Sequence, residues 1–273
     1  MKKALALVLA CLLLAACSGA PPSSEAEEPA GAGGSTRRDA VQSGVLQFTT
    51  PAEGDMVAAI ETALGTIRLV LYPQHAPLAV ENFCTLAQRG WYDGAAFHRV
   101  VAGFVVQAGD KDGTGLSGES IWGVPFATER SDKLHHYAGA LCMAAADGQP
   151  DTHESQFYVV ACAQDSLDEA ALEKLAAAGL REEVVEAYRQ AGGAPYLDNT
   201  DTVFGQVYAG MDVVDKIAAL PADEEGRPKE PLAITRITVE TYGNGGQNTP
   251  APEASQPAPP ASENAQSTAP LEP

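Results

Sequence analysis

Residues 97–110, FHRVVAGFVVQAGD, decide how this chain is interpreted, because they combine strand-forming residues with two polar side chains at a regular spacing. Arg99 and Gln107 are eight positions apart, an even number. Residues an even number apart in a strand point to the same face, so Arg99 and Gln107 are predicted to share a face with Phe97 and Val101. A guanidinium and a carboxamide on one side of an apolar β segment need a functional explanation.

Apolar runs on both sides of this segment predict a β-rich domain. Residues 56–72 contain two alternating runs around a Leu-Gly turn, which indicates a hairpin. Further short strands are expected at residues 97–101, 103–107, 139–145, 155–162, 202–208 and 232–241. Helices are expected at 76–90 and 211–219. This pattern predicts an all-β-dominated fold, an eight-stranded antiparallel barrel that is closed or nearly closed and capped by two helices, since closure removes exposed edges.

Residues 165–193 interrupt the strands with an amphipathic helical pattern. Ser166 and Glu169 have the spacing of a capping box, and Gly179 separates two helices. We therefore expect an inserted helical hairpin whose apolar faces pack on the barrel or on a partner. Three roles stay open for it: enlarging a binding groove, selecting clients, or bracing the barrel.

The N-terminus has the composition of a lipoprotein precursor. Residues 1–16 begin with two lysines and continue as an apolar run too short to span a membrane comfortably, which predicts a signal peptide. Residues 14–17, LAAC, match a lipobox, so Cys17 is the expected lipidated residue. The alternative is an ordinary signal peptide followed by a chance cysteine.

Two further segments lack any apolar periodicity. Residues 17–44 are rich in Pro, Gly, Ser, Ala and Glu and are expected to form a flexible linker. Residues 243–273 contain seven prolines and no Lys or Arg, and are expected to be a disordered tail that serves as a spacer or binds something. The folded domain is therefore expected at residues 45–242, which are enough for one substantial core.

Charge and cysteine content narrow the classes of function. The formal net charge is −19 and no basic stripe or run is present after the signal segment, which argues against binding of nucleic acid. Beyond the lipobox, Cys84, Cys142 and Cys162 each lie in an apolar pattern. Their odd number and surroundings indicate small core residues rather than a disulfide framework.

Several motifs, taken together and in order, resemble the cyclophilin family. They are FHRVVAGFVVQAGDKDGTGLSGESIWG at 97–123, LHHYAGALCMA at 134–144, SQFYV at 155–159, YLDNTDTVFGQVYAGMDVVDKI at 196–217 and the upstream ETALGTIRLVLYPQHAPLAVENF at 61–83. The resemblance runs from about residue 56 to 240 and is interrupted only by the helical insert. It implies an eight-stranded barrel that catalyses cis–trans isomerisation of peptidyl-prolyl bonds.

The resemblance assigns roles to particular residues. Arg99 matches the catalytic arginine of the family, and Gln107 matches the glutamine that binds the peptide backbone beside it. The walls of the proline pocket would be Phe104, Val105, Tyr158 and Leu197, with Tyr158 at a position where the family usually has phenylalanine. Isomerisation makes and breaks no covalent bond, so we expect no nucleophile, no cofactor and no metal. The pair His135 and His136 has no carboxylate or cysteine at ligand spacing, which also argues against a metal site.

Other positions of the substrate site match the family pattern less closely. Ala144 is followed by Ala145 where cyclophilins carry an asparagine whose backbone binds substrate, a contact that tolerates the change. Asp201 replaces a histidine of the pocket rim, and Tyr196 replaces a tryptophan associated with cyclosporin affinity. His98 is expected to be a hydrogen-bonded structural residue at the edge of the site rather than an acid or base. Isomerase activity is expected to survive these changes, whereas cyclosporin sensitivity is left open.

The expected substrates are proline-containing polypeptides. With the lipobox, the resemblance predicts a monomeric isomerase, anchored by lipid outside the bacterial cell membrane, that assists the folding of exported proteins, whose slow prolyl steps limit folding. One alternative is a module that binds proline segments as an adhesin or holdase with little turnover. A second alternative, a solute-binding lipoprotein, would need two α/β lobes, and the parallel βαβ alternation of such lobes is absent from the sequence pattern.

Overall fold

A computed structural model of the chain describes Val41 and residues 44–243. The strands are β1 (Met56–Thr62), β2 (Gly65–Leu71), β3 (Arg99–Val101), β4 (Val105–Ala108), β5 (Ala140–Ala145), β6 (His153–Val160), β7 (Val203–Ala209) and β8 (Ile234–Thr241). The α-helices are α2 (Pro77–Gln88), α3 (Glu169–Ala177), α4 (Glu182–Ala191) and α5 (Met211–Ala218). Short 3-10 turns occur at η1 (Leu46–Phe48), η2 (Ala146–Gly148) and η3 (Pro195–Leu197). The predicted signal peptide with Cys17, nearly all of the linker and the C-terminal tail lie outside the described residues.

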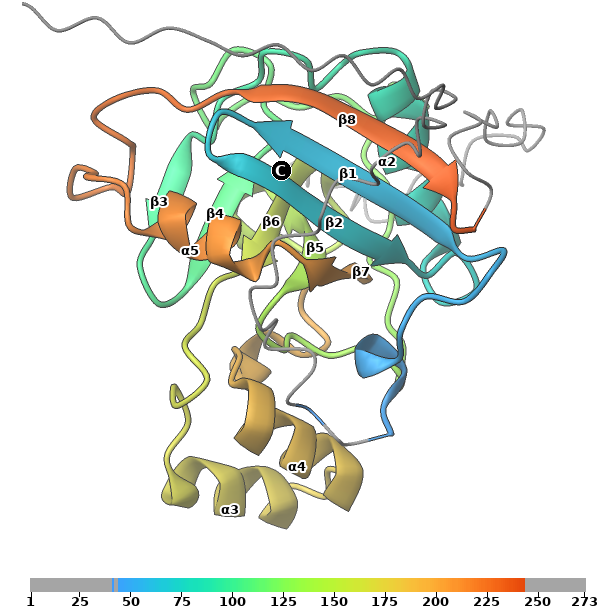
Figure 1. Cartoon of the computed structure of the whole chain (residues 1–273), viewed down its shortest axis with the longest axis vertical. Coiled ribbons are helices and arrows are strands. Elements are labelled where there is room, and N and C mark those ends of the chain that lie inside the picture. Colours follow the sequence, from blue (N-terminus) through green and yellow to red (C-terminus); the bar gives the residue numbers. More distant parts are fainter. Residues whose placement is uncertain (1–40, 42–43, 244–273) are drawn as a thin grey trace, which may run out of the picture. The chain divides into compact units, whose positions relative to one another are not determined.

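The eight strands form one antiparallel sheet in the order β3-β4-β6-β5-β7-β2-β1-β8. The segments that precede the two edge strands meet at a bridge between Ala96 and Ala233. There the N–H of Phe97 donates to the carbonyl of Leu232 at 2.9 Å, and the N–H of Ile234 donates to that of Ala95 at 2.9 Å. The sheet therefore curls until its edges touch (Figure 1), and the predicted eight-stranded antiparallel barrel is confirmed.

Helices α2 and α5 contribute to the main hydrophobic core together with the inner faces of the strands. Phe83 of α2 is fully buried, and its ring lies 5.4 Å from that of Phe157 on β6 and 5.3 Å from that of Phe204 on β7. On α5, Val214 and Ile217 are completely buried against the same core. These are the two helices predicted to cap the barrel, and both do so through apolar residues at helical spacing.

Helices α3 and α4 form the predicted hairpin beyond the sheet (Figure 1). Their apolar faces pack on Tyr137 and on the segment before β1, where Val41 and Val45 are buried, rather than on the strands of the barrel. Val41 had been expected in the flexible linker, so the packed region includes at least this residue as well. The capping-box prediction is wrong. The N-cap of α3 is Asp168, whose side chain accepts the N–H of Ala171 at 2.8 Å.

Ser166 has a different role from the one predicted. Its hydroxyl accepts the N–H of Gly193 at 3.2 Å, and it therefore joins the two ends of the insert. A capping box and this closure both use a serine near the start of a helix, and the sequence pattern does not distinguish them.

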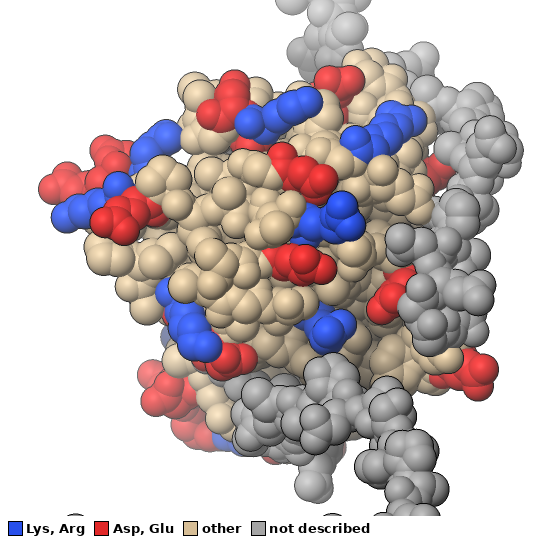
Figure 2. All heavy atoms as spheres, turned by 45° about the horizontal axis from the view of Figure 1, so that its top comes forward, with Lys and Arg blue, Asp and Glu red and all other residues tan. Residues whose placement is uncertain are grey.

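The three cysteines of the described region are buried and not joined in disulfides, as predicted. Burial raises the pKa of Cys84 to about 12, so its thiol stays protonated and unreactive. Figure 2 shows acidic and basic side chains interspersed over the face it presents, with no basic stripe there. Within the part of the chain that the structure describes, none of the helices has both the length and the apolar character needed to span a bilayer.

Candidate functional site

The site is built on the hairpin of β3 and β4. Arg99 lies directly opposite Gln107 in the antiparallel register. Val100 and Val106 are buried in the core, so Arg99 and Gln107 point to the outer face. The predicted shared face is confirmed, although it results from pairing across a hairpin. Phe97 does not share this face: it precedes the start of β3, and its side chain is buried in the core with Val100.

The same outer face continues across two more strands. Gln107 on β4 is paired with Tyr158 on β6, and Tyr158 is paired with Cys142 on β5. Directly opposed residues in a sheet present their side chains on the same side. Arg99, Gln107 and Tyr158 therefore form a row across the sheet, although they come from segments up to 59 residues apart in the chain.

Arg99 is poised next to an aromatic ring rather than a carboxylate. Its Cζ atom lies 5.6 Å from the ring centroid of Phe104, within the range of a cation–π contact. No acidic side chain among the described residues lies within ion-pair distance of Arg99. The guanidinium is therefore not committed to an acidic partner among the described residues, and it faces the groove described below, where a ligand can reach it.

Gln107 is held in place by a second glutamine. Its Nε2 donates to Oε1 of Gln156 at 2.9 Å, and Nε2 of Gln156 donates to the carbonyls of Ser117 at 2.8 Å and Gly115 at 3.2 Å. Gln156 thus joins the hairpin to the Gly-rich loop at 110–119. The sequence analysis did not assign Gln156 to the site, although the SQFYV motif contains it.

A groove of about 480 Å³ lies beside these side chains. Its lining includes Arg99, Gln107, Ala144 and Ala145, four residues that the sequence analysis placed in the site. The other lining residues were not expected at the site from the sequence, and they include Leu116, Glu154 and Gln156. Glu154 precedes the SQFYV motif, and burial raises the pKa of its carboxyl group.

The predicted proline pocket is one continuous apolar patch beside Arg99. Phe104, Val105, Tyr158 and Leu197 belong to a single hydrophobic cluster on the outer side of the sheet. Val105 and Tyr158 are only 2% and 5% exposed, so they form the floor of the patch. Tyr196 is 68% exposed and its ring stacks on that of Phe104, with centroids 6.1 Å apart and planes at 27°.

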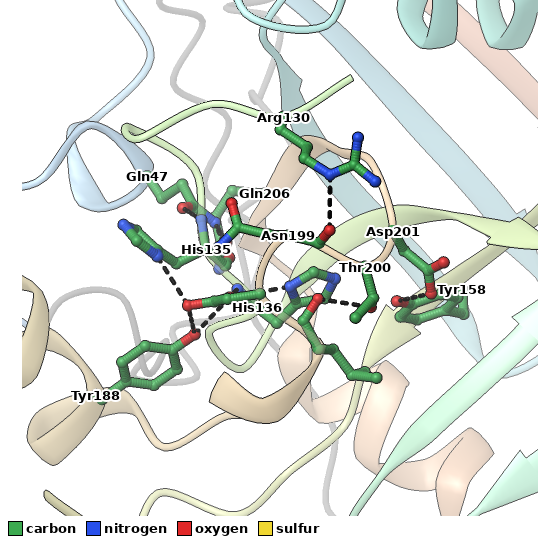
Figure 3. Close-up of polar contacts among 12 residues, drawn as sticks. Gln47, Arg130, His135, His136, Tyr158, Tyr188, Asn199, Thr200, Asp201 and Gln206 are labelled. Atoms are coloured by element: carbon green, nitrogen blue, oxygen red, sulfur yellow. Dashed lines mark hydrogen bonds and ion pairs between the residues drawn. The ribbon is translucent and has the colours of Figure 1, made fainter. Parts of the chain in front are cut away.

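Asp201, expected at the rim of the pocket, makes a specific hydrogen bond to a residue of the patch. The hydroxyl of Tyr158 donates to Oδ2 of Asp201 at 2.8 Å, and Figure 3 shows the two side chains pointing toward each other. Burial raises the pKa of Tyr158 well above its ordinary value, so the phenol keeps its proton and remains the donor. The two departures from the family pattern at these positions are therefore a matched pair.

His98 is buried next to the site, and the hydrogen bond that the sequence predicted for its ring is not formed with the part of the chain that the structure describes. Neither of its ring nitrogens makes a well-formed hydrogen bond within the described residues. Burial lowers the pKa of His98, so the imidazole is neutral near pH 7. The ring supports the Gly-rich loop, because a β-carbon at Gly115 would lie 3.2 Å from its Cδ2 atom.

The Gly-rich loop is organised by one buried carboxylate. Asp110 accepts hydrogen bonds from the backbone N–H groups of Asp112 and Gly115 and from the hydroxyls of Thr114 and Ser117. Although burial opposes it, these hydrogen bonds lower the pKa of Asp110 to about 2. The loop that lines the groove therefore depends on an ionised carboxylate.

The two adjacent histidines share a carboxylate partner that their local spacing in the sequence does not reveal. Nδ1 of His135 lies 2.8 Å from Oδ2 of Asp198, and Nδ1 of His136 lies 3.0 Å from Oδ1 of the same residue. Asp198 is more than sixty residues downstream, so no local spacing could reveal it. Within the described residues, no group of three or more His, Cys, Asp or Glu side chains is arranged to hold a metal ion.

Comparison with known proteins places this fold and site in one family. Residues 57–239 match the model of the family described as cyclophilin type peptidyl-prolyl cis-trans isomerase/CLD. A provisionally named peptidyl-prolyl cis-trans isomerase of Staphylococcus saprophyticus is 40% identical over 194 residues, which cover 71% of this chain and 96% of that protein. The crystal structure of a Cryptosporidium parvum cyclophilin-type isomerase, determined in the presence of the dipeptide Ala-Pro, superimposes with a TM-score of 0.54 at 26% identity and covers 68% of this chain and 99% of that one.

A second curated relative is larger than this chain. A provisionally named bifunctional phosphatase/peptidyl-prolyl cis-trans isomerase of Streptococcus pyogenes is 42% identical over 182 residues, which are 66% of this chain but only 38% of that protein. The enzyme class expected from the sequence is thus confirmed at the level of the family. With most of its length matched in sequence and its fold matched in structure, the chain belongs to the cyclophilin-type peptidyl-prolyl cis-trans isomerases.

Proposed function

We propose that this chain catalyses the cis–trans isomerisation of X–Pro peptide bonds at the groove beside Arg99. The observation that carries the proposal is the position of the Arg99 guanidinium. It lines the groove, lies 5.6 Å from the ring centroid of Phe104 and has no ion-pair partner among the described residues. A proline ring resting on Phe104 would bring its nitrogen next to this cation.

The chemistry of the reaction fits such an arrangement. Resonance gives the X–Pro bond partial double-bond character and a rotation barrier of about 18–20 kcal/mol. As the amide twists, the lone pair becomes localised on the prolyl nitrogen, where a positive charge stabilises it. A guanidinium is suited to this role because it stays charged and presents donors in a rigid plane. It therefore stabilises the twisted state more than either planar state, which is the requirement for catalysis.

The other residues orient the peptide. Gln107, fixed by Gln156, would donate to or accept from the peptide backbone beside the proline. Phe104, Tyr196 and Leu197 would hold the proline ring through apolar contact, and the backbone of Ala145 would bind the preceding residue. None of these steps involves a proton transfer or a bound ion.

An isomerase assay with matched arginine variants tests this assignment. We expect Arg99→Ala to lower kcat/KM for an Ala-Pro peptide by about 10²-fold, the usual cost of removing one electrostatic donor from a transition state. Arg89→Ala, at an exposed arginine at the end of α2, is the control and should keep the wild-type rate. NMR exchange spectroscopy on the full chain gives the rates directly. Full activity of Arg99→Ala would overturn the assignment.

We also propose that the protein acts outside the bacterial cell membrane on exported polypeptides, held there by lipid on Cys17. Support comes from residues 1–17, where a lysine-rich start and an apolar run precede the LAAC sequence. Two or three acyl chains on one cysteine give stable anchoring, whereas a single chain is marginal. Exported chains meet slow prolyl isomerisation as they fold, so an isomerase at this place has substrates.

Fractionation of a bacterium that expresses the full chain tests the anchor. The wild-type protein is expected in the membrane fraction and to incorporate labelled fatty acid. Cys17→Ala should prevent the incorporation and move the protein out of the membrane fraction. Labelling that is unchanged by Cys17→Ala would sink the proposal of lipidation at this residue without affecting the isomerase assignment.

A binding module with little turnover is the second candidate. It is favoured by Leu116 and Tyr196, two large apolar side chains that are 88% and 68% exposed. Leu116 lines the groove with Arg99, and the ring of Tyr196 stacks on that of Phe104. Such side chains can hold an unfolded segment. Binding of an Ala-Pro peptide together with a rate no faster than the uncatalysed one, which takes tens to hundreds of seconds, would favour this reading.

A further inference from the structure

The wall of the proline patch lies on the segment that follows the inserted hairpin. Helix α4 ends at Ala191, and the chain then forms η3 (Pro195–Leu197) and a turn up to Asp201. Tyr196, Leu197 and Asp201, three of the predicted substrate-site residues, are all on this short segment. Its conformation therefore sets the shape of the patch.

Helix α4 of the hairpin is hydrogen-bonded to this segment at Asp198, the residue after Leu197. The hydroxyl of Tyr188 on α4 lies 2.8 Å from both carboxylate oxygens of Asp198. His135 and His136 donate to the same carboxylate through Nδ1 at 2.8 and 3.0 Å, and the backbone N–H of His136 donates at 2.8 Å. Figure 3 shows Tyr188 and the two histidines converging from different segments.

The Asp198 carboxylate is largely buried, and both of its oxygens accept hydrogen bonds. The Asp198 side chain is 12% exposed, that of His136 is 1% exposed, and Tyr188 is completely buried. Although burial opposes it, hydrogen bonds from His135 and His136 keep the pKa of Asp198 well below its usual range. A buried charge held by several donors from different segments has one geometry, because any displacement leaves donors and acceptor unpaired.

The cluster is connected to the patch at its other side. The ring of His136 stacks on Tyr158, with centroids 6.3 Å apart and planes at 19°. Tyr158 in turn donates to Asp201 at 2.8 Å. The segment is thus fixed at Asp198 by the hairpin and at Asp201 by the floor of the patch, with Leu197 just before the first of these anchors.

We infer that Asp198 is a positioning residue through which Tyr188 of the inserted hairpin holds the wall of the proline patch. The inference rests on the proposed function for its consequence in substrate binding. It selects among the open roles of the insert, because a hairpin that only braced the barrel would not need a buried hydrogen bond to the segment that carries the substrate-site residues. The side chain of Asp198 is hydrogen-bonded to Tyr188, His135 and His136, none of which lines the groove beside Arg99, so its expected effect is on binding and not on the twisted amide.

Two neighbouring tyrosines provide a matched test. Tyr188→Phe removes the hydroxyl that binds Asp198, whereas Tyr137→Phe removes a buried hydroxyl that has no partner among the described residues. The two rings are 4.5 Å apart in the same apolar cluster, so the losses of packing are alike. We expect Tyr188→Phe to raise KM for an Ala-Pro peptide about threefold or more with kcat nearly unchanged, as for lost uniform binding, and Tyr137→Phe to change neither. Asp198→Asn, if it folds, should raise KM further.

The methyl resonances of Leu197 give a second readout that does not depend on turnover. They should shift in Tyr188→Phe and keep their wild-type positions in Tyr137→Phe. Wild-type KM in Tyr188→Phe, or unshifted Leu197 resonances, would overturn the inference even if isomerase activity is intact. A wild-type protein without turnover, together with the Leu197 shift in Tyr188→Phe alone, would instead uphold the positioning role and reject the proposed function.

Discussion

At the scale of the residue, the site departs from its family where a phenol and a carboxylate stand in place of a phenyl ring and an imidazole. Tyr158 forms the floor of the apolar patch, and Asp201 is at its edge. Either change alone would leave a buried hydroxyl or a carboxylate without its partner. Together they satisfy each other through one hydrogen bond, which leaves the face of the Tyr158 ring available for apolar contact.

A double-mutant cycle measures this pairing. Tyr158→Phe is expected to lower the free energy of unfolding by about 1–2 kcal/mol, because Asp201 loses a donor to a charged acceptor. Asp201→Ala, which removes the acceptor, should have a similar cost, and the double variant should cost less than the sum of the two. Chemical denaturation supplies the three values. Strict additivity would mean that the hydrogen bond contributes nothing.

Asp110 gives a prediction for the effect of pH. Its pKa in the folded state is lowered to about 2 from an ordinary 3.8, so the ionised form stabilises the fold above about pH 4. This contribution, about 2 kcal/mol, should be lost as the pH falls from about 4 to 2. Asp110→Asn should be less stable than the wild type at pH 7 and should lose less on acidification. Denaturation curves for both proteins at several pH values, with the exposed Asp132→Asn as control, check the sign.

At the scale of the element, the chain leaves the helical hairpin at a point where two backbone segments are in very close contact. Gly192 ends α4 with φ +72°, and a β-carbon there would lie 2.0 Å from the carbonyl oxygen of Ala163. Ala163 precedes the insert, so the segment that enters the insert and the segment that leaves it are in contact at this point. The insert can therefore end only at a residue without a side chain.

Two glycine substitutions in the insert separate this contact from backbone strain. Gly192→Ala combines a left-handed φ with the clash against Ala163 and should cost about 3 kcal/mol or more. Gly179→Ala has φ +89° but nothing within 4 Å of the new methyl group, so it should cost about 1 kcal/mol. Thermal unfolding ranks the two variants. Equal costs would show that the contact relaxes without penalty.

What the sequence could predict at this scale depends on whether the signal is local. The barrel strands and both helices of the hairpin follow from periodicity within each segment, and these predictions are confirmed. The cap of α3 and the direction of Phe97 were mispredicted, because each depends on where a regular element begins, to within one or two residues. The hydrogen-bonded cluster around Asp198 could not be predicted from the sequence, because His135, His136 and Tyr188 come together with Asp198 only in the folded chain.

At the scale of the whole molecule, the segment before β1 links the hairpin to the barrel. Gln47 of η1 is completely buried, and its amide donates to Oε1 of Gln206 on β7 at 2.8 Å and to the carbonyl of His135 at 2.9 Å. Its Oε1 accepts the N–H of His135 at 2.6 Å. One side chain therefore connects the N-terminal segment, the sheet and the histidine pair that binds Asp198.

Replacing Gln47 should destabilise the molecule as a whole. Gln47→Ala leaves a buried amide oxygen and a buried N–H without partners, so the expected loss is about 2–4 kcal/mol. Thr49→Ala, an exposed neighbour with only a local hydrogen bond, should lose less than about 1 kcal/mol. Urea denaturation compares them. A small effect of Gln47→Ala would show that water replaces the lost contacts.

The contact between the two edges of the sheet has a consequence for an enzyme that handles unfolded chains. A free sheet edge is a template onto which an extended polypeptide adds as a further strand. Here the N–H of Val100 on β3 is bonded to the carbonyl of Gly226, and the start of β8 is bonded to the segment at 94–95. We expect these bonds to keep an extended polypeptide from adding as a further strand at β3 and at the start of β8.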